Sequence, residues 1–142
     1  MILDTTYLLP LAQIAVDKDL LASVAKRNTD VKLEDISVSL ISVFELQAKS
    51  AKLNIPAKPV IRAVDAIMSA FRVVPFYEPE IIDIGQKIRK MVSDYVDCIL
   101  IATAISKKED LVTEDSLIQE KKGKLLKECN LKVVSFKDLV KT

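Results

Sequence analysis

Residues 94–104 read DYVDCILIATA, in which two aspartates three positions apart are followed by an almost unbroken apolar run. At helical spacing, Asp94 and Asp97 share one face, at the point where the apolar run begins. A helix that is apolar on all sides belongs in the interior of a domain. The stretch therefore predicts a buried helix with an acidic start. Either the acids only begin the helix, or they belong to a metal site whose other ligands lie elsewhere in the chain.

Short apolar or β-branched segments alternate with amphipathic segments on both sides of this helix. The strand candidates are residues 1–5, 36–41, 72–77, 110–115 and 131–136. The helix candidates are residues 7–16, 19–27, 42–53, 60–71, 78–92, 96–108 and 116–129. Strands separated by helices favour parallel pairing through crossover connections. We therefore predict one domain over residues 1–142, a three-layer α/β/α fold with a mostly parallel sheet of about four to five strands.

The amino-acid composition excludes several classes of catalytic and binding site. The chain has 142 residues, 50% of them hydrophobic, and a net charge of +1 from 21 basic and 20 acidic residues. It has no histidine, two cysteines and two glycines, which argues against zinc sites, Ser-His or Cys-His catalysis and glycine-rich phosphate loops. No apolar run approaches the ~20 residues that span a bilayer, and the N-terminal segment lacks the basic start of a signal peptide. We expect a cytoplasmic protein without a membrane partner, whose chemistry comes from carboxylates, hydroxyls and lysines.

Four acidic side chains follow four separate segments. Asp4 follows the first strand, Glu45 the second, Asp97 begins the buried helix and Asp115 follows the fourth strand. In parallel sheets of this kind, ligands gather outside the carboxyl ends of the strands. Clustered carboxylates repel one another unless they take up protons or cations, and hard divalent cations such as Mg²⁺ or Mn²⁺ prefer oxygen ligands. The pattern predicts a metal site.

Each of these acids also has a purely structural alternative, as a helix cap, a first-turn acid or part of a capping box. For Glu45 the box would pair it with Ser42. Asp94 competes with Asp97 for the site but lies nearer the helix start, where it can act as a solvated cap. We select Asp97 because it directly precedes the apolar run.

These segments together resemble the PIN domain family of metal-dependent ribonucleases. They are ILDTTYLL (residues 2–9), SLISVFELQ (39–47), VDCILIATAISKKEDLVTED (96–115) and the closing strand. Family members show Asp-Thr or Asp-Ser after the first strand, a Glu in an apolar helix start, an Asp opening an Ala-rich helix, and Thr-x-Asp after the next strand. The matching residues, in order, are Asp4, Glu45, Asp97, Thr113 and Asp115. The short chain resembles the VapC-type toxins of toxin–antitoxin pairs.

The resemblance implies an Mg²⁺- or Mn²⁺-dependent endoribonuclease that hydrolyses RNA phosphodiester bonds. Asp4 and Asp97 would make the main metal contacts, and Asp115 and Glu45 would complete the site directly or through water. The expected partners are an RNA substrate, a small antitoxin protein and a second copy in a homodimer.

We also predict side chains that hold the metal ligands in place and side chains that bind the RNA backbone. Thr5 or Thr113 would hydrogen-bond a ligand carboxylate. Because acids repel phosphate, RNA binding requires basic residues around the rim, for which the candidates are Lys49, Lys52 and Arg62. A second basic run, EKKGKLLKE at residues 120–128, is more typical of a solvated helix face.

Two alternatives remain open. The first is a catalytically inactive PIN-like module that binds RNA or protein, which would bind Mg²⁺ or Mn²⁺ feebly and cut nothing. The second is a receiver-type signalling domain, which needs adjacent acids after the first strand and a lysine after the last. Asp4 stands alone before two threonines, although Lys137 does follow the last strand. A phosphatase with Asp-x-Asp is disfavoured for the same reason.

Overall fold

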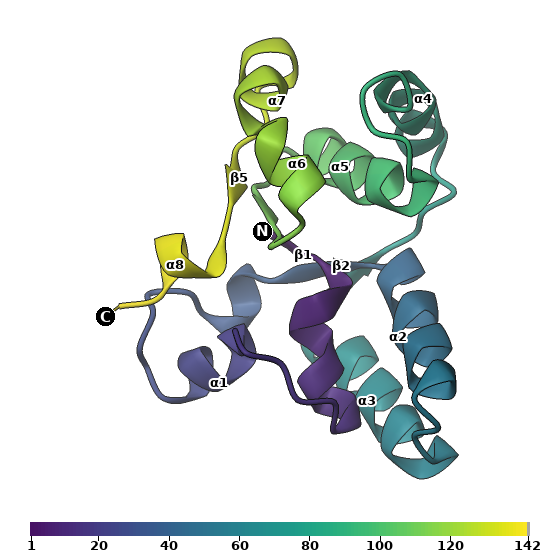
Figure 1. Cartoon of the computed structure of the whole chain (residues 1–142), viewed down its shortest axis with the longest axis vertical. Helices are drawn as coiled ribbons and strands as arrows, with labels where there is room; N and C mark the ends of the chain where they lie inside the picture. Colours follow the sequence, from purple (N-terminus) through teal and green to yellow (C-terminus); the bar gives the residue numbers. More distant parts are fainter. Residues whose placement is uncertain (142) are drawn as a thin grey trace.

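The computed structural model describes residues 1–141 as a sheet between two layers of helices (Figure 1). The strands are β1 (Ile2–Leu3), β2 (Ser37–Ser39), β3 (Arg72–Val74), β4 (Leu111–Val112) and β5 (Val133–Val134). The helices are η1 (Thr5–Ala12), α1 (Leu20–Ala25), η2 (Leu33–Asp35), α2 (Leu40–Lys52), α3 (Ala57–Ala70), α4 (Pro79–Ile88), α5 (Tyr95–Lys107), α6 (Ser116–Glu120), α7 (Lys122–Cys129) and α8 (Phe136–Leu139). The strand order is β3-β2-β1-β4-β5, and every pairing is parallel. The predicted three-layer fold is confirmed.

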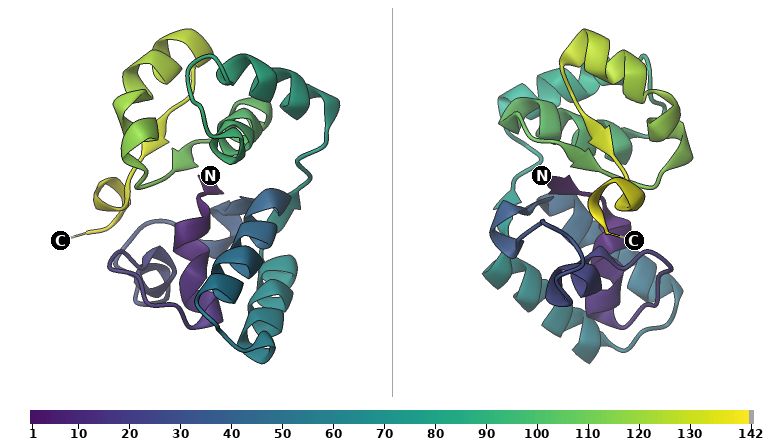
Figure 2. Two further views of the ribbon diagram at one scale, coloured as in Figure 1. Left: turned by 45° about the vertical axis from the view of Figure 1, so that its right-hand side comes forward. Right: turned by 90° about the vertical axis from the view of Figure 1, so that its left-hand side faces the viewer.

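Hydrophobic cores on both faces of the sheet hold the layers together, and a smaller cluster joins β3 to α4 and α5. Successive strand residues point to opposite faces. The residues that pack against α5, α6 and α7 are Ile2, Leu111 and Val133. The residues that pack against η1, α1, α2 and α3 are Leu3, Val112 and Val134. Figure 2 shows these two helical layers on either side of the sheet, the first half of the chain forming one and the green helices the other.

Helix α5 is the buried helix that residues 94–104 predict. Every residue from Cys98 to Ala104 is buried, because α5 packs against β1 and β4 on one side and against α4 on the other. Its start is capped by Asp94, and it ends at Lys108, whose φ of 56° stops the helix. None of the helices within residues 1–141 is both long and apolar enough to cross a bilayer.

Two predicted helices differ from the structure near the ends of the chain. The first segment is a 3₁₀ helix, Thr5–Ala12, and not an α-helix over residues 7–16. Pro10 lies inside it and has no N–H to donate to an α-helical hydrogen bond. The helix predicted over residues 116–129 is broken at Lys121 into α6 and α7.

The capping box predicted for Ser42 and Glu45 is also wrong. Helix α2 begins three residues earlier than this box requires, at Leu40, and its cap is Ser39, whose hydroxyl accepts a hydrogen bond from the Ile41 N–H at 3.3 Å. Glu45 therefore lies in the second turn of α2, free of any capping role.

The strand order places a crevice at the carboxyl ends of β1 and β4. From β1 the chain builds β2 and β3 on one side, and then returns to build β4 and β5 on the other. Ligands of parallel α/β sheets bind at such reversals. Asp4 follows β1 and Thr113 follows β4 at this point.

Candidate functional site

A hollow of about 350 Å³ opens at this crevice and gathers acidic side chains from four parts of the chain. It is lined by Asp4, Thr6, Glu45, Lys49, Asp94, Asp97, Glu114 and Asp115. We call it the acidic hollow. The four acids selected from the sequence thus lie around one space, although each comes from a different element.

Asp4 is held in place by two neighbours. Its Oδ1 accepts a hydrogen bond from the Thr5 N–H at 2.7 Å, and its Oδ2 accepts one from the Thr113 hydroxyl at 2.6 Å. Burial raises the pKa of Asp4 above its ordinary value, and these two hydrogen bonds oppose that rise. Each oxygen still has a lone pair for a cation. Asp4 is therefore both the cap of η1 and a carboxyl group held in one position at the crevice.

Glu45 reaches the same region from α2. Its Oε1 accepts a hydrogen bond from the Thr5 hydroxyl at 2.5 Å. Thr5 is completely buried, so this contact fixes Glu45 against the residue that follows Asp4. The two hydroxyls predicted as supports therefore hold different carboxylates, since Thr5 contacts Glu45 and Thr113 contacts Asp4.

Asp97 experiences the combined field of the other acids. Burial raises its pKa to about 7, assisted by repulsion from Asp94, Asp115, Asp4 and Glu45, in that order. An ionised Asp97 is therefore costly in the metal-free protein, and the group favours a proton or a cation. Acids from all four segments therefore act on Asp97 through their charge.

Asp115 continues from Thr113 in a tight turn. Its backbone N–H donates to the Thr113 hydroxyl at 3.0 Å, and its Oδ1 accepts from the Ile118 N–H at 3.0 Å as the cap of α6. Thr113 thus bridges Asp115 and Asp4. Asp115, like Asp4, therefore caps a helix and also lines the acidic hollow. Both roles are possible at once because the helices begin just after the strands whose carboxyl ends form the crevice.

Asp94 occupies the role of a solvated cap. Its Oδ1 accepts the Val96 N–H at 2.8 Å and the Asp97 N–H at 3.3 Å. We expect Asp94→Ala to lower the free energy of unfolding by about 1 kcal/mol and Asp94→Asn to lower it much less, since Asn also caps well. Urea unfolding of both variants tests this. An equal loss in both would mean that the charge, and not the cap, stabilises α5.

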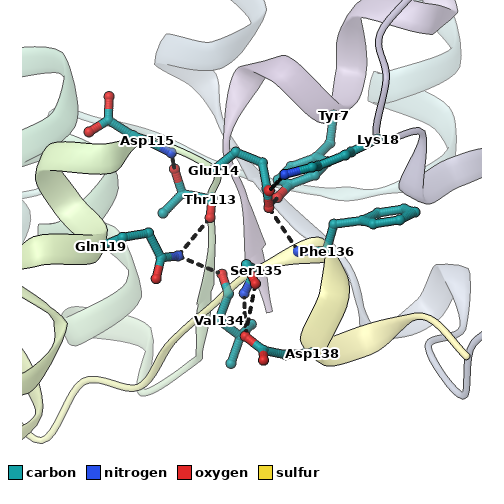
Figure 3. A network of polar contacts seen from close by, with 10 residues as sticks. All are labelled: Tyr7, Lys18, Thr113, Glu114, Asp115, Gln119, Val134, Ser135, Phe136 and Asp138. Atoms are coloured by element: carbon teal, nitrogen blue, oxygen red, sulfur yellow. Dashed lines mark hydrogen bonds and ion pairs between the residues drawn. The ribbon is translucent and has the colours of Figure 1, made fainter. Parts of the chain in front are cut away.

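Glu114 is a wall residue that the sequence did not single out, and it belongs to a separate network (Figure 3). Its Oε2 accepts from the Tyr7 hydroxyl at 2.5 Å and from the Phe136 N–H at 2.8 Å, and its Oε1 accepts from Lys18 Nζ at 2.7 Å. Burial alone would raise the pKa of Glu114, but these donors lower it below its ordinary value. The Asp115 side chain points away from this network. No local sequence signal separates Glu114 from its acidic neighbour Asp115, because its partners lie far away in the chain.

Of the basic rim candidates, only Lys49 lines the acidic hollow. It lies one turn beyond Glu45 on α2 and interacts electrostatically with Asp4. Lys52, near the end of α2, and Arg62, on α3, lie outside the lining.

The donor set is suited to a hard divalent cation, because every candidate ligand is a carboxylate. As the side chains stand, no three acidic or cysteine residues within 1–141 converge closely enough to grip one ion. Metal binding here therefore requires the carboxylates to close in around the ion. The raised pKa of Asp97 supplies a reason, since a cation removes the repulsion that the acids otherwise share.

Comparisons with known proteins were made on sequence and on structure. The family model of the PIN domain matches residues 1–124. A search of curated proteins gave no significant match. Among solved structures, FitAcB from Neisseria gonorrhoeae aligns with a TM-score of 0.68 and 23% identity, over 95% of this chain and 96% of that chain.

Two further structures have the same fold. A toxin–antitoxin complex from Klebsiella pneumoniae aligns with a TM-score of 0.61 and 21% identity, over 81% of this chain and 86% of that one. VapBC2 from Rickettsia felis, bound to a DNA fragment from its promoter, aligns with a TM-score of 0.62 and 19% identity, over 94% and 96% of the two chains. At these identities the likeness concerns the fold. Because the family model covers most of the sequence, the chain belongs to the PIN domain family.

Proposed function

We propose that this protein is an Mg²⁺- or Mn²⁺-dependent endoribonuclease and the toxin of a toxin–antitoxin pair. The observation that carries the proposal is the gathering of Asp4, Glu45, Asp97 and Asp115 around one hollow at the carboxyl ends of β1 and β4, in a chain of the PIN family. The toxin role is supported by the structural similarity to a toxin–antitoxin complex and to VapBC2.

In this proposal Asp4 and Asp97 provide the main metal contacts, and Glu45 and Asp115 complete the site directly or through water. If these residues hold a divalent metal, the chemistry it would supply is a water of lowered pKa as the nucleophile for phosphorus. The Thr113 hydroxyl keeps the Asp4 carboxylate in one orientation by donating a hydrogen bond to its Oδ2 at 2.6 Å. Lys49, at the wall of the hollow, offsets part of the acidic charge that an approaching phosphate meets.

We expect the purified protein to cleave single-stranded RNA with Mn²⁺ or Mg²⁺ and to lose that activity completely in EDTA, because the donors available are carboxylates. Gel electrophoresis of one defined RNA measures its cleavage before EDTA is added, after it is added, and after the metal is restored. Persistent cleavage in EDTA would contradict the metal role. A catalytically inactive binding module, the remaining alternative, would show feeble Mn²⁺ binding in calorimetry and no cleavage.

The toxin role has its own test in living cells. Expression of the chain in a bacterial cytoplasm should arrest growth, and an Asp4→Asn variant should not. A small antitoxin and a homodimer belong to the same proposal, and size-exclusion chromatography with light scattering tests the homodimer. If the chain cleaves RNA in vitro but its expression does not affect growth, the toxin role is refuted and the proposed nuclease activity stands.

A further inference from the structure

A second hollow, of about 330 Å³, adjoins the acidic hollow, and three of its six lining residues are lysines. The lining residues are Lys18, Glu114, Gln119, Lys122, Ser135 and Lys137. We call it the basic pocket. Glu114 lines both hollows, so the two share a wall at the same edge of the sheet. Figure 3 shows Lys18, Glu114, Gln119 and Ser135 around the turn after β4 and the end of β5.

The shared wall is fixed by the network around Glu114. Three donors satisfy its carboxylate: the Tyr7 hydroxyl, the Phe136 N–H and Lys18 Nζ. Tyr7 is completely buried, and Phe136 begins α8. A carboxylate with three donors has little reason to turn towards a metal, so Glu114 separates the two hollows and does not join the acidic set.

The remaining lysines of the basic pocket are uncommitted. Within residues 1–141, neither Lys122 nor Lys137 forms an ion pair. Asp138 lies near enough to interact electrostatically with both, but its carboxylate already accepts from the Ser135 N–H at 2.8 Å and from the Ser135 hydroxyl at 3.0 Å. The lining itself holds three lysines and one carboxylate, Glu114, so it carries net positive charge, which Asp17 and Asp138 nearby partly offset.

We propose that the basic pocket binds a backbone phosphate of the RNA strand adjacent to the phosphate placed at the acidic hollow. The proposal rests on the proposed ribonuclease function. Until metal ions bind, the carboxylates of the acidic hollow repel the RNA backbone and contribute nothing to its affinity. The positive groups that attract the strand therefore have to lie beside this hollow. Ammonium groups without carboxylate partners suit a phosphodiester oxygen, which accepts charge-assisted hydrogen bonds. Lys122 belongs to the basic run expected to be a solvated helix face; it is exposed, as that reading expects, and it also lines this pocket.

The test compares two double variants that remove the same charge. Lys122→Gln with Lys137→Gln removes the two lysines of the basic pocket that form no ion pair and leaves the Lys18–Glu114 pair in place. Lys124→Gln with Lys127→Gln removes two exposed lysines of α7 that lie outside it. Binding of a short labelled single-stranded RNA is measured in EDTA over a range of salt concentrations, with circular dichroism confirming the fold. We expect the pocket variant to bind about tenfold more weakly and its salt slope to fall by about 0.7 for each phosphate that it no longer binds, with a smaller change in the control.

A second measurement locates the bound phosphate on the strand. RNAs carrying one uncharged methylphosphonate linkage at successive positions are bound to wild type and to the pocket variant. Wild type should lose affinity at one particular linkage, which lies next to the cleaved one where Mn²⁺ supports cleavage, and the pocket variant should be insensitive at that linkage. Single-stranded DNA of the same sequence should show the same loss, because the pocket contacts phosphate and not the 2′-hydroxyl.

Some results would overturn this inference. Equal losses in the pocket and control variants would mean that only general charge attracts RNA. No loss in the pocket variant, or a loss confined to RNA and absent with DNA, would also overturn it. Absence of cleavage by wild type with Mn²⁺ refutes the proposed activity alone, since the binding measurements in EDTA need no catalysis and still decide whether the pocket holds phosphate.

Discussion

Asp4→Asn is expected to lower Mn²⁺-dependent RNA cleavage about a thousandfold while leaving the fold intact. The Asp4 carboxylate lies at the carboxyl end of β1 with one hydrogen bond on each oxygen, so an amide in its place removes a metal ligand without removing the side chain. Loss of a metal-held reaction site costs several kcal/mol of transition-state stabilisation. Asn is also a good helix cap, and the Thr113 hydroxyl can reverse its role towards the amide.

The same variant has a readout that is independent of catalysis. Calorimetric titration with Mn²⁺ should show binding weakened at least about tenfold, since one of the main ligands loses its charge. Asp83→Asn is the matched control, because Asp83 is an exposed acid on α4 that pairs with Lys87 at 3.1 Å and lies away from the hollow. Full metal-dependent cleavage by Asp4→Asn would refute the site assignment. A loss equal to that in Asp83→Asn would point to a non-specific charge effect.

The sequence predicts the fold well because the fold depends on periodic features. Five short strand candidates alternate with amphipathic segments, and connections of this kind give parallel pairing whatever the detailed contacts. The exact ends of the helices are not predicted, because neighbouring residues can serve equally well as caps. Ser39 and Ser42 both suit a helix cap, and only the position of β2 in the sheet selects Ser39. The 3₁₀ form of η1 is consistent with Pro10 inside it, which has no N–H for an α-helical hydrogen bond.

The acidic site was predictable for a topological reason. Residues that follow parallel strands share one edge of the sheet, so Asp4 and Asp115 come to line the same hollow once β1 and β4 are neighbours. Glu114 and Lys18 were not predictable in this way. Their hydrogen bond joins residues 96 positions apart, across a loop whose path no local pattern specifies. The basic pocket depends on the same loop and on β5, which explains why Lys122 resembles an ordinary surface lysine in the sequence.

Asp97→Asn is expected to make the metal-free protein more stable at neutral pH, by about 1 to 2 kcal/mol after allowance for solvent screening of a half-buried carboxylate. The folded protein holds the pKa of Asp97 at about 7, raised from 3.8. Below the lower value Asp97 is protonated in both folded and unfolded chains and contributes no difference. As pH rises towards 7, the unfolded chain releases the proton while the folded chain retains it, so unfolding becomes easier. Above about 7 the penalty is complete.

Urea unfolding of wild type and Asp97→Asn in EDTA, from acidic to neutral pH, measures this difference. The two proteins should be equally stable near pH 4 and diverge as pH rises, with wild type the weaker. Saturating Mn²⁺ should then reverse the order, because wild type gains stability from binding while the variant, lacking a ligand, gains less. A variant less stable than wild type in EDTA at neutral pH would mean that Asp97 makes stabilising contacts and is not a repelled anion. A constant difference across the pH range would exclude ionisation of Asp97 as its cause.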